Sequence, residues 1–245
     1  MYVDVTGSGT PVLLLHGAGV AGWMWSPLRR CLPACKAVVP DLPGFGRSST
    51  EDYVSHERTL DELSHVIKEH APGGAVVVGF SLGAQLAILL AAERASLVRG
   101  AVVVSAETTP TPLPRLMAEL TLLATPLARN TRFARLQAKQ LKIPAELLDD
   151  YVRESRTVSR ATLLASIEDN FRFTVPAGWS SFPGPVDVLV GANERGFMRR
   201  SALITSAAAP RGTLHTVPRA AHDIPLTRPG VLADVIERQL QLSRG

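Results

Sequence analysis

The chain has 245 residues, of which 46% are hydrophobic and 20% are charged, and this composition excludes an intrinsically disordered or fibrous protein. Its formal net charge is +4, and the arginines and lysines are spread along the chain, which argues against a nucleic-acid-binding protein. The length is typical of one α/β domain, so we expect a single domain over residues 1–245.

The N-terminal residues contain neither the basic cluster nor the apolar stretch of a signal peptide. The longest apolar runs, such as residues 86–92, are far shorter than the ~20 residues that span a bilayer. These features predict a cytoplasmic protein without a membrane span. Cys31 and Cys35 have no His or Cys neighbours that would complete a zinc site, so we expect small apolar core residues and no metal.

Short apolar runs recur along the chain and predict strands that are buried on both faces. They occupy residues 12–15, 37–39, 75–78, 101–104 and 186–190, with a weaker pattern at 213–217. Helical patterns lie at residues 53–70, 82–94 and 231–242. This alternation predicts a doubly wound α/β fold with a mostly parallel sheet and helices on both faces.

Residues 110–183 interrupt the alternation, because they show no strand pattern. They indicate several short amphipathic helices, such as 115–127 and 145–153, separated by prolines. A helical insertion between two core strands predicts a lid over the ends of the sheet. Alternatively, these helices only thicken the domain. The Leu, Ala and Met content of the segment predicts a mainly apolar pocket for a small acyl substrate.

The strongest local signal is Gly-Phe-Ser-Leu-Gly at residues 79–83, which follows a predicted strand and opens a predicted helix. A nucleophile elbow needs this strand–turn–helix context, and its glycines remove side chains that would clash. The serine then stands at the N-terminus of a helix, where a developing anion is favoured. We therefore predict that Ser81 is a nucleophile. The alternative is a tight turn in which Ser81 caps the helix.

Two further loops follow predicted strands. In His16-Gly17-Ala18-Gly19, the glycines allow the backbone to approach the elbow, so the N–H groups of Ala18 and Leu82 are predicted to form an oxyanion hole. We expect His16 to make structural hydrogen bonds. Asp41 opens the second loop, and its carboxylate is expected to bond to backbone and Arg groups rather than to act as a catalytic acid.

The motifs His-Gly at 16–17, Asp-Leu-Pro-Gly-Phe-Gly-Arg-Ser at 41–48 and Gly-Phe-Ser-Leu-Gly at 79–83 occur in the order and spacing of a known superfamily. The chain resembles the α/β-hydrolases, in the branch with a small helical lid. The resemblance extends from about Gly7 to Leu242. It implies the α/β-hydrolase fold, a Ser–acid–His order along the chain, and neither a metal nor an organic cofactor.

This order requires a histidine after the insertion, and His215 and His222 are the two candidates. His215 lies within the predicted strand at 213–217, which would fix it in the sheet. His222 lies in the loop Arg-Ala-Ala-His-Asp, and the branch resembled here carries its base in such a loop. We predict His222 as the general base. Its neighbour Asp223 is poorly placed to pair with it, because adjacent side chains seldom face each other.

The resemblance places the triad acid in the turn after residues 186–190. That turn usually has the sequence Gly-x-x-Asp, and here it is Gly-Ala-Asn-Glu, so Glu194 takes the position of the acid. A glutamate can orient the imidazole as an aspartate does. Two alternatives remain: Glu194 pairs with Arg195 at the surface, or Glu107 is the acid, since some relatives take it from the preceding strand.

Together these residues predict a serine hydrolase that cleaves an ester or thioester through an acyl-enzyme. The same triad also supports C–C bond hydrolysis or lyase chemistry, because a fold does not fix its reaction. A third interpretation is a ligand-binding protein of this fold that lacks catalysis. The positive net charge is compatible with a substrate linked to an acidic carrier protein.

Overall fold

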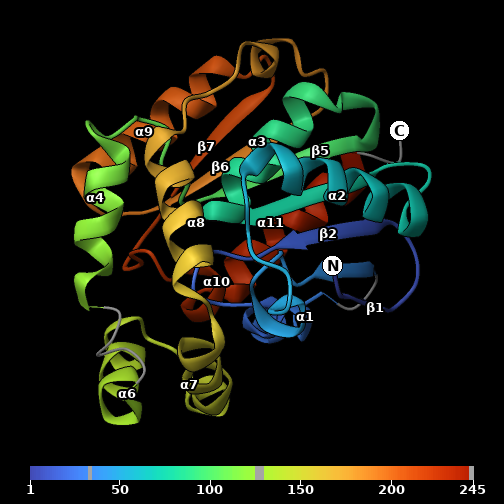
Figure 1. Cartoon of the computed structure of the whole chain (residues 1–245). Helices are drawn as coiled ribbons and strands as arrows, with labels where there is room; N and C mark the ends of the chain where they lie inside the picture. Colours follow the sequence, from blue (N-terminus) through green and yellow to red (C-terminus); the bar gives the residue numbers. More distant parts are fainter. Residues whose placement is uncertain (33–34, 125–129, 243–245) are drawn as a thin grey trace.

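The computed structural model describes residues 1–32, 35–124 and 130–242. Its centre is a sheet of seven strands in the order β1-β3-β2-β4-β5-β6-β7 (Figure 1). Every neighbouring pair is parallel except β1 and β3, which are antiparallel. The predicted α/β fold with a mostly parallel sheet is therefore confirmed. The strands are β1 (Val3–Thr6), β2 (Pro11–Leu15), β3 (Lys36–Pro40), β4 (Ala75–Phe80), β5 (Val98–Val104), β6 (Val186–Gly191) and β7 (Gly212–Val217).

The sheet contains one strand that the sequence patterns did not predict. β1 has four residues, lies at the edge of the sheet, and is only partly buried, so it lacks a continuous apolar run. The predicted strands are present with slightly wider bounds. β4, for example, continues through Gly79 to Phe80, because both residues remain in register with β5.

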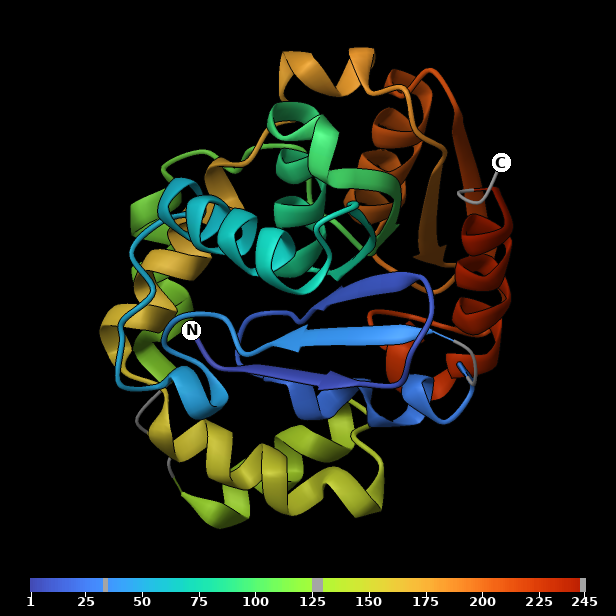
Figure 2. The same ribbon diagram turned by 90° about the vertical axis from the view of Figure 1, so that its right-hand side faces the viewer.

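Helices cover both faces of the sheet, and alternate residues of each strand point to opposite layers. Ala75 and Val77 of β4 pack with the layer that contains α2 and α3, whereas Val76 and Val78 pack with the layer that contains α1 and α11. Figure 2 shows α2 and α3 (cyan to green) on one side of the strands and α1 (blue) on the other. The covering helices are α1 (Ser26–Arg29), α2 (His56–His70), α3 (Leu82–Glu93), α9 (Gly196–Ala208), α10 (Ile224–Thr227) and α11 (Pro229–Leu242).

Some of these helices differ from the sequence prediction: α1 and α10 are short and were not predicted, and α2 and α9 differ as follows. α2 begins at His56 rather than at residue 53, because the Ser55 hydroxyl caps it by accepting the Arg58 N–H at 3.2 Å. α9 was not predicted, and its buried face includes Ser201, Thr205 and Ser206, which weaken the apolar periodicity.

The described residues between β5 and β6 form helices and turns and no strand. They include α4 (Pro114–Thr121), α6 (Thr131–Gln140), α7 (Leu148–Thr157) and α8 (Arg160–Arg172), with α6 and α7 at the lower edge of Figure 1. The predicted helix 115–127 ends at Thr121 and continues as a short 3₁₀ turn, Leu122–Ala124, while its residues 125–127 lie outside the described residues. The predicted helix 145–153 is a 3₁₀ turn, Ala145–Leu147, followed by α7.

The two cysteines are free thiols. Cys35 is buried in a cluster of apolar core residues. Cys31 is partly buried and packs against the same cluster. Among the helices of the described residues, none has the length and apolar character needed to cross a membrane.

Candidate active site

Ser81 lies in the sharp turn between β4 and α3, where its φ and ψ angles are 54° and −114°. Glycines on both sides permit this turn. A Cβ atom on Gly79 would lie 2.1 Å from the carbonyl oxygen of Gly83, and one on Gly83 would lie 2.2 Å from that of Leu15. The Ser81 N–H donates to the carbonyl of Val104 at 2.9 Å, which fixes the turn against β5. This backbone strain is typical of a functional serine rather than of an ordinary helix cap.

The predicted oxyanion-hole residues come from two elements beside this turn. Leu82 is the first residue of α3, where a backbone N–H has no partner within the helix. The loop after β2 lies against Ser81, since a Cβ atom on Gly17 would be 3.3 Å from the Ser81 Cβ. Ala18 follows in this loop and is exposed. The structure thus places the Ala18 loop and the start of α3 next to the predicted nucleophile.

His16 makes the structural hydrogen bonds expected of it, and Asp41 bonds to backbone N–H groups as expected, whereas the Arg47 guanidinium bonds to the Tyr2 hydroxyl instead. The fully buried His16 ring donates from Nδ1 to the Gly17 carbonyl (2.8 Å) and accepts the Leu42 N–H at Nε2 (2.9 Å). Burial lowers the pKa of His16, which favours this neutral form. The Asp41 carboxylate accepts the backbone N–H groups of Gly22 (2.7 Å) and Arg47 (2.9 Å).

His222 and Glu194 face each other across two loops. The distance from His222 Nδ1 to Glu194 Oε2 is 3.3 Å, and the His222 ring packs against Phe80 with 4.8 Å between the ring centroids. Glu194 Oε1 accepts hydrogen bonds from the Ser105 hydroxyl (2.5 Å) and the Gly191 N–H (3.1 Å). Burial opposes ionisation of Glu194, which is only 5% exposed, but the hydrogen bonds from His222 and Ser105 outweigh it and lower its pKa.

The sequence left three alternatives open: a surface pair of Glu194 with Arg195, His215 as the base, and Glu107 as the acid. Glu194 turns inward to His222, whereas Arg195 is exposed. His215 is fixed within β7 by a hydrogen bond from Nε2 to Asp187 of β6. Glu107 lies in the loop after β5 and accepts hydrogen bonds from Asn170 Nδ2 (3.2 Å) and the Thr111 hydroxyl (3.4 Å). Burial raises the pKa of Glu107, and these two hydrogen bonds partly offset that effect.

A cavity of about 490 Å3 brings these segments together. Its lining residues come from the elbow, the loop after β5, α8, the turn after β6, α9 and the His222 loop: Ser81, Glu107, Asn170, Asn193, Glu194, Arg195, Phe197, Met198, Ala221 and His222. Ser81, His222 and both candidate acids thus share one cavity.

The surface of this pocket is mainly apolar, as predicted, but among the described residues its apolar part does not come from the insertion. Residues 110–183 contribute only the polar Asn170 to the cavity, and its apolar lining comes from Phe197, Met198 and Ala221. The Leu and Met side chains of α4 point outward instead, and Leu116, for example, is 52% exposed.

Sequence reasoning missed two residues that shape this site. Ser105 directly follows the buried run of β5, and a polar residue at the carboxyl end of a parallel strand is a signal that could have identified it. Asn170 carries no such signal, because its position near Ser81 depends on how α8 packs against the core.

The comparisons with known proteins agree with this architecture. Residues 12–235 match the model of the alpha/beta hydrolase family, so the chain belongs to this family. It is 35% identical over 106 residues to the pimeloyl-[acyl-carrier protein] methyl ester esterase of Vibrio cholerae, a match that covers 43% of this chain and 40% of that protein. It is 39% identical over 117 residues to an esterase of Mycobacterium tuberculosis, which covers 47% of this chain and 38% of that protein. The matches therefore span about two fifths of these curated relatives.

Solved structures resemble the chain over nearly its whole length. An esterase from Exiguobacterium antarcticum has a TM-score of 0.82 at 16% identity, with coverage of 98% of this chain and 95% of that one. A thermophilic esterase from Thermogutta terrifontis has a TM-score of 0.81 at 20% identity, with coverage of 100% and 94%. At this level of identity, the likeness shows the fold.

Proposed function

We propose that the protein is a serine hydrolase that cleaves a carboxylic ester or thioester through an acyl-enzyme. The observation that carries the proposal is the pairing of His222 with the buried Glu194 carboxylate, in the same cavity as Ser81 on its strained turn. A histidine oriented by a carboxylate next to a serine is the arrangement that activates a hydroxyl nucleophile.

The proposed mechanism assigns one role to each group. The Nδ1–H group of His222 donates a hydrogen bond to Glu194, so the unprotonated Nε2 can take the proton of the Ser81 hydroxyl as Oγ attacks the carbonyl carbon. The N–H groups of Ala18 and Leu82 stabilise the resulting oxyanion. His222 then protonates the leaving group, and the alcohol or thiol departs. Water that His222 deprotonates attacks the acyl-enzyme, and His222 returns this proton to Ser81 Oγ as the carboxylic acid is released.

The substrate is proposed to be a small ester whose acyl part is mainly apolar. Phe197, Met198 and Ala221 supply apolar surface beside Ser81. A more specific version links the acyl group to a carrier protein, supported by the name of the Vibrio cholerae relative and by the net charge of +4. Comparing kcat/KM for one acyl methyl ester, free and attached to acyl carrier protein, tests this version. Equal values would reject it.

The experiment that tests the activity itself is a panel of esters and thioesters assayed with the wild type, Ser81→Ala and His222→Ala. Each substitution should reduce turnover by roughly 10⁶-fold, because nucleophile and base act as a unit. His215→Ala is the matched control and should retain turnover. Activity of Ser81→Ala within tenfold of the wild type would refute the proposal. A wild type that is inactive on the whole panel would also contradict it, and covalent modification of Ser81 by a fluorophosphonate would then favour C–C hydrolase or lyase chemistry.

We also propose that residues 110–183 act as a lid that is coupled to the histidine loop. Lys142, between α6 and α7, forms an ion pair with Asp223 in which Nζ and Oδ2 are 2.6 Å apart. The other oxygen of Asp223 accepts the Ala221 N–H at 2.8 Å. Asp223 thus connects the insertion to the backbone on both sides of His222.

This coupling is tested with Lys142→Met, which keeps the aliphatic stem and removes the charge. Asp223 is buried and would lose its cationic partner, so kcat should fall by about tenfold with altered preference for acyl length. Lys139→Met, at an exposed position of α6, is the control and should leave both properties unchanged. Identical kinetics for the two variants would contradict the coupling.

A further inference from the structure

The proposed mechanism uses one of the two glutamates in the cavity. Both oxygens of Glu194 are engaged, one by Ser105 and Gly191 and the other by His222. Glu107 is only partly buried, and each of its oxygens accepts one hydrogen bond, at 3.4 and 3.2 Å. Because an ionised carboxylate offers about four acceptor sites, Glu107 keeps acceptor capacity in the cavity that also contains Ser81.

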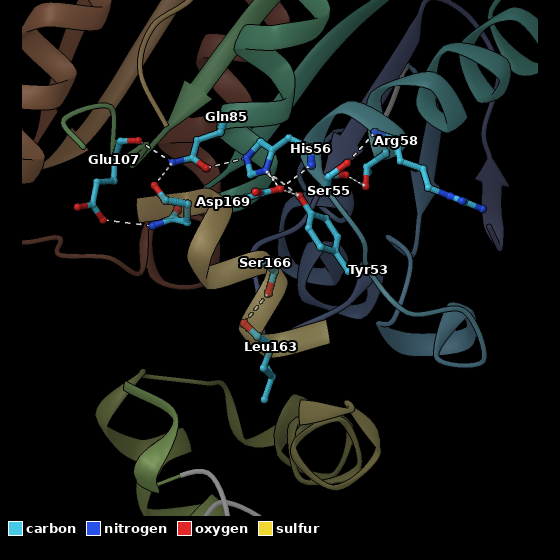
Figure 3. Close-up of polar contacts among 11 residues, drawn as sticks. Tyr53, Ser55, His56, Arg58, Gln85, Glu107, Leu163, Ser166 and Asp169 are labelled. Carbon is cyan, nitrogen blue, oxygen red and sulfur yellow. Dashed lines mark hydrogen bonds and ion pairs between the residues drawn. The ribbon is translucent and has the colours of Figure 1, made fainter. Parts of the chain in front are cut away.

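A buried hydrogen-bond network holds Glu107 in place (Figure 3). The fully buried Gln85 donates from Nε2 to the backbone carbonyls of Glu107 (2.6 Å) and Asn170 (3.2 Å). Its Oε1 lies 2.9 Å from His56 Nε2, and His56 Nδ1 lies 3.0 Å from Asp169. Since the Gln85 amide nitrogen is turned to two carbonyls, its oxygen must accept the proton of His56.

This network connects three elements around the cavity. Gln85 is in the first turns of α3, which begins after Ser81, and it bonds to the loop after β5 and to α8 of the insertion. The backbone of Glu107 and that of Asn170 are therefore fixed relative to the proposed nucleophile. A preorganised site loses little conformational entropy when a ligand binds.

The groups that Glu107 and Asn170 leave available are mainly acceptors: the unused lone pairs of the Glu107 carboxylate and Asn170 Oδ1, beside the second N–H of the Asn170 amide. Asn170 directs its amide N–H to the Glu107 carboxylate, so its Oδ1 remains to accept. Among the described residues, the structure gives Glu107 no ion pair with a cationic side chain, although Arg195 lines the same cavity. Arg195 is exposed and its charge is screened by solvent, whereas the partly buried carboxylate is screened less.

We propose that Glu107 and Asn170 form a specificity site that binds a hydrogen-bond-donating group of the substrate, best an ammonium, and rejects a carboxylate. An ammonium has three donors and no acceptor, so it matches this set of acceptors. A carboxylate in the same position would face a like charge in a partly desolvated cavity. The inference rests on the proposed hydrolase activity, because it defines which esters the cavity accepts.

The test uses straight-chain methyl esters of matched length that end in a methyl, hydroxyl, ammonium or carboxylate group. Their hydrolysis is measured by the release of protons. For the wild type, kcat/KM for the ammonium ester should exceed that for the carboxylate ester by about tenfold or more. Glu107→Gln should bring this ratio close to one, because the amide has no charge with which to attract the ammonium or repel the carboxylate. Glu57→Gln, an exposed glutamate of α2, is the matched control and should keep the wild-type ratio.

Two results would overturn the inference: a wild type that prefers the carboxylate ester, or a ratio that Glu107→Gln leaves unchanged. If the wild type hydrolyses none of the esters, the hydrolase proposal fails, and equilibrium binding then decides the inference. Calorimetry should show tighter binding of hexylammonium than of hexanoate by the wild type and a loss of this difference in Glu107→Gln. Equal binding of the two ligands by the wild type would reject the specificity site.

Discussion

Glu194 and Glu107 follow neighbouring parallel strands and line the same cavity, but their carboxylates differ in burial and in the hydrogen-bond donors around them. The turn after β6 buries Glu194 and surrounds it with three donors, from Ser105, Gly191 and His222. The loop after β5 leaves Glu107 partly exposed, with two hydrogen bonds, at 3.2 and 3.4 Å. The pKa of Glu194 is accordingly lowered and that of Glu107 raised.

The difference shows that the donors around a carboxylate, and not its burial alone, determine the direction in which its pKa moves. Burial opposes ionisation at both positions, and only the donors around Glu194 outweigh it. Glu194 is the carboxylate that contacts His222, so it can orient this histidine and stabilise its protonated form, whereas Glu107 makes no hydrogen bond to His222 among the described residues. The comparison therefore supports Glu194 as the proposed triad acid and leaves Glu107 to interact with substrate.

The largest expected difference between the two positions is in turnover. Glu194→Gln should lower kcat for an uncharged ester by roughly 10²–10⁴-fold, because an amide can stabilise the wrong tautomer of His222. Glu107→Gln should keep kcat for the same ester within tenfold of the wild type. Steady-state kinetics of both variants measure this. A collapse for Glu107→Gln with an active Glu194→Gln would assign the acid to the loop after β5.

A smaller effect is expected from the donors themselves. Ser105→Ala removes one hydrogen bond to Glu194, which then has fewer contacts to hold it, so kcat should fall by roughly tenfold. The corresponding change beside Glu107 is Thr111→Val, which keeps the shape and removes the hydroxyl. It should alter kcat for an uncharged ester by less than about twofold. An equal fall in kcat for the two variants would show that the hydrogen bonds to Glu194 contribute no more to turnover than those to Glu107.

The smallest effect concerns stability. Glu194 has a lowered pKa in the folded state, so it contributes stability above the unfolded-state pKa, and this contribution is lost as the pH falls through the folded-state pKa. Glu107 has a raised pKa, so its ionised form costs stability at neutral pH. This cost decreases as the pH falls through the folded-state pKa and is gone below the lower, unfolded-state pKa.

Urea unfolding of the two amide variants checks these signs. At neutral pH, the free energy of unfolding should decrease in Glu194→Gln and increase slightly in Glu107→Gln. In acid, below both folded-state pKa values, both differences should shrink. A stabilised Glu194→Gln at neutral pH would contradict the pKa directions.

The sequence was sufficient to predict the elements whose structure depends on residues close to one another along the chain. The elbow around Ser81 needs two glycines within a short segment, and the buried strands that frame it are continuous apolar runs. Glu194 was predicted from the resemblance to the α/β-hydrolases, which carry the triad acid in the turn after this strand. β1, by contrast, exists because it pairs with β3 at the edge of the sheet. Asn170 reaches the cavity through packing of α8, and such long-range contacts leave no periodic pattern in the sequence.

The central claim is that Ser81 is a nucleophile activated by His222 and Glu194, with Glu107 outside this group. Time-resolved mass spectrometry of fluorophosphonate labelling tests it in the wild type, Glu194→Gln and Glu107→Gln, with the modified residue located by peptide mapping. We predict modification of Ser81 in all three proteins, at similar rates in the wild type and Glu107→Gln and much more slowly in Glu194→Gln. Modification of a different residue, or equal rates in all three proteins, would contradict the account.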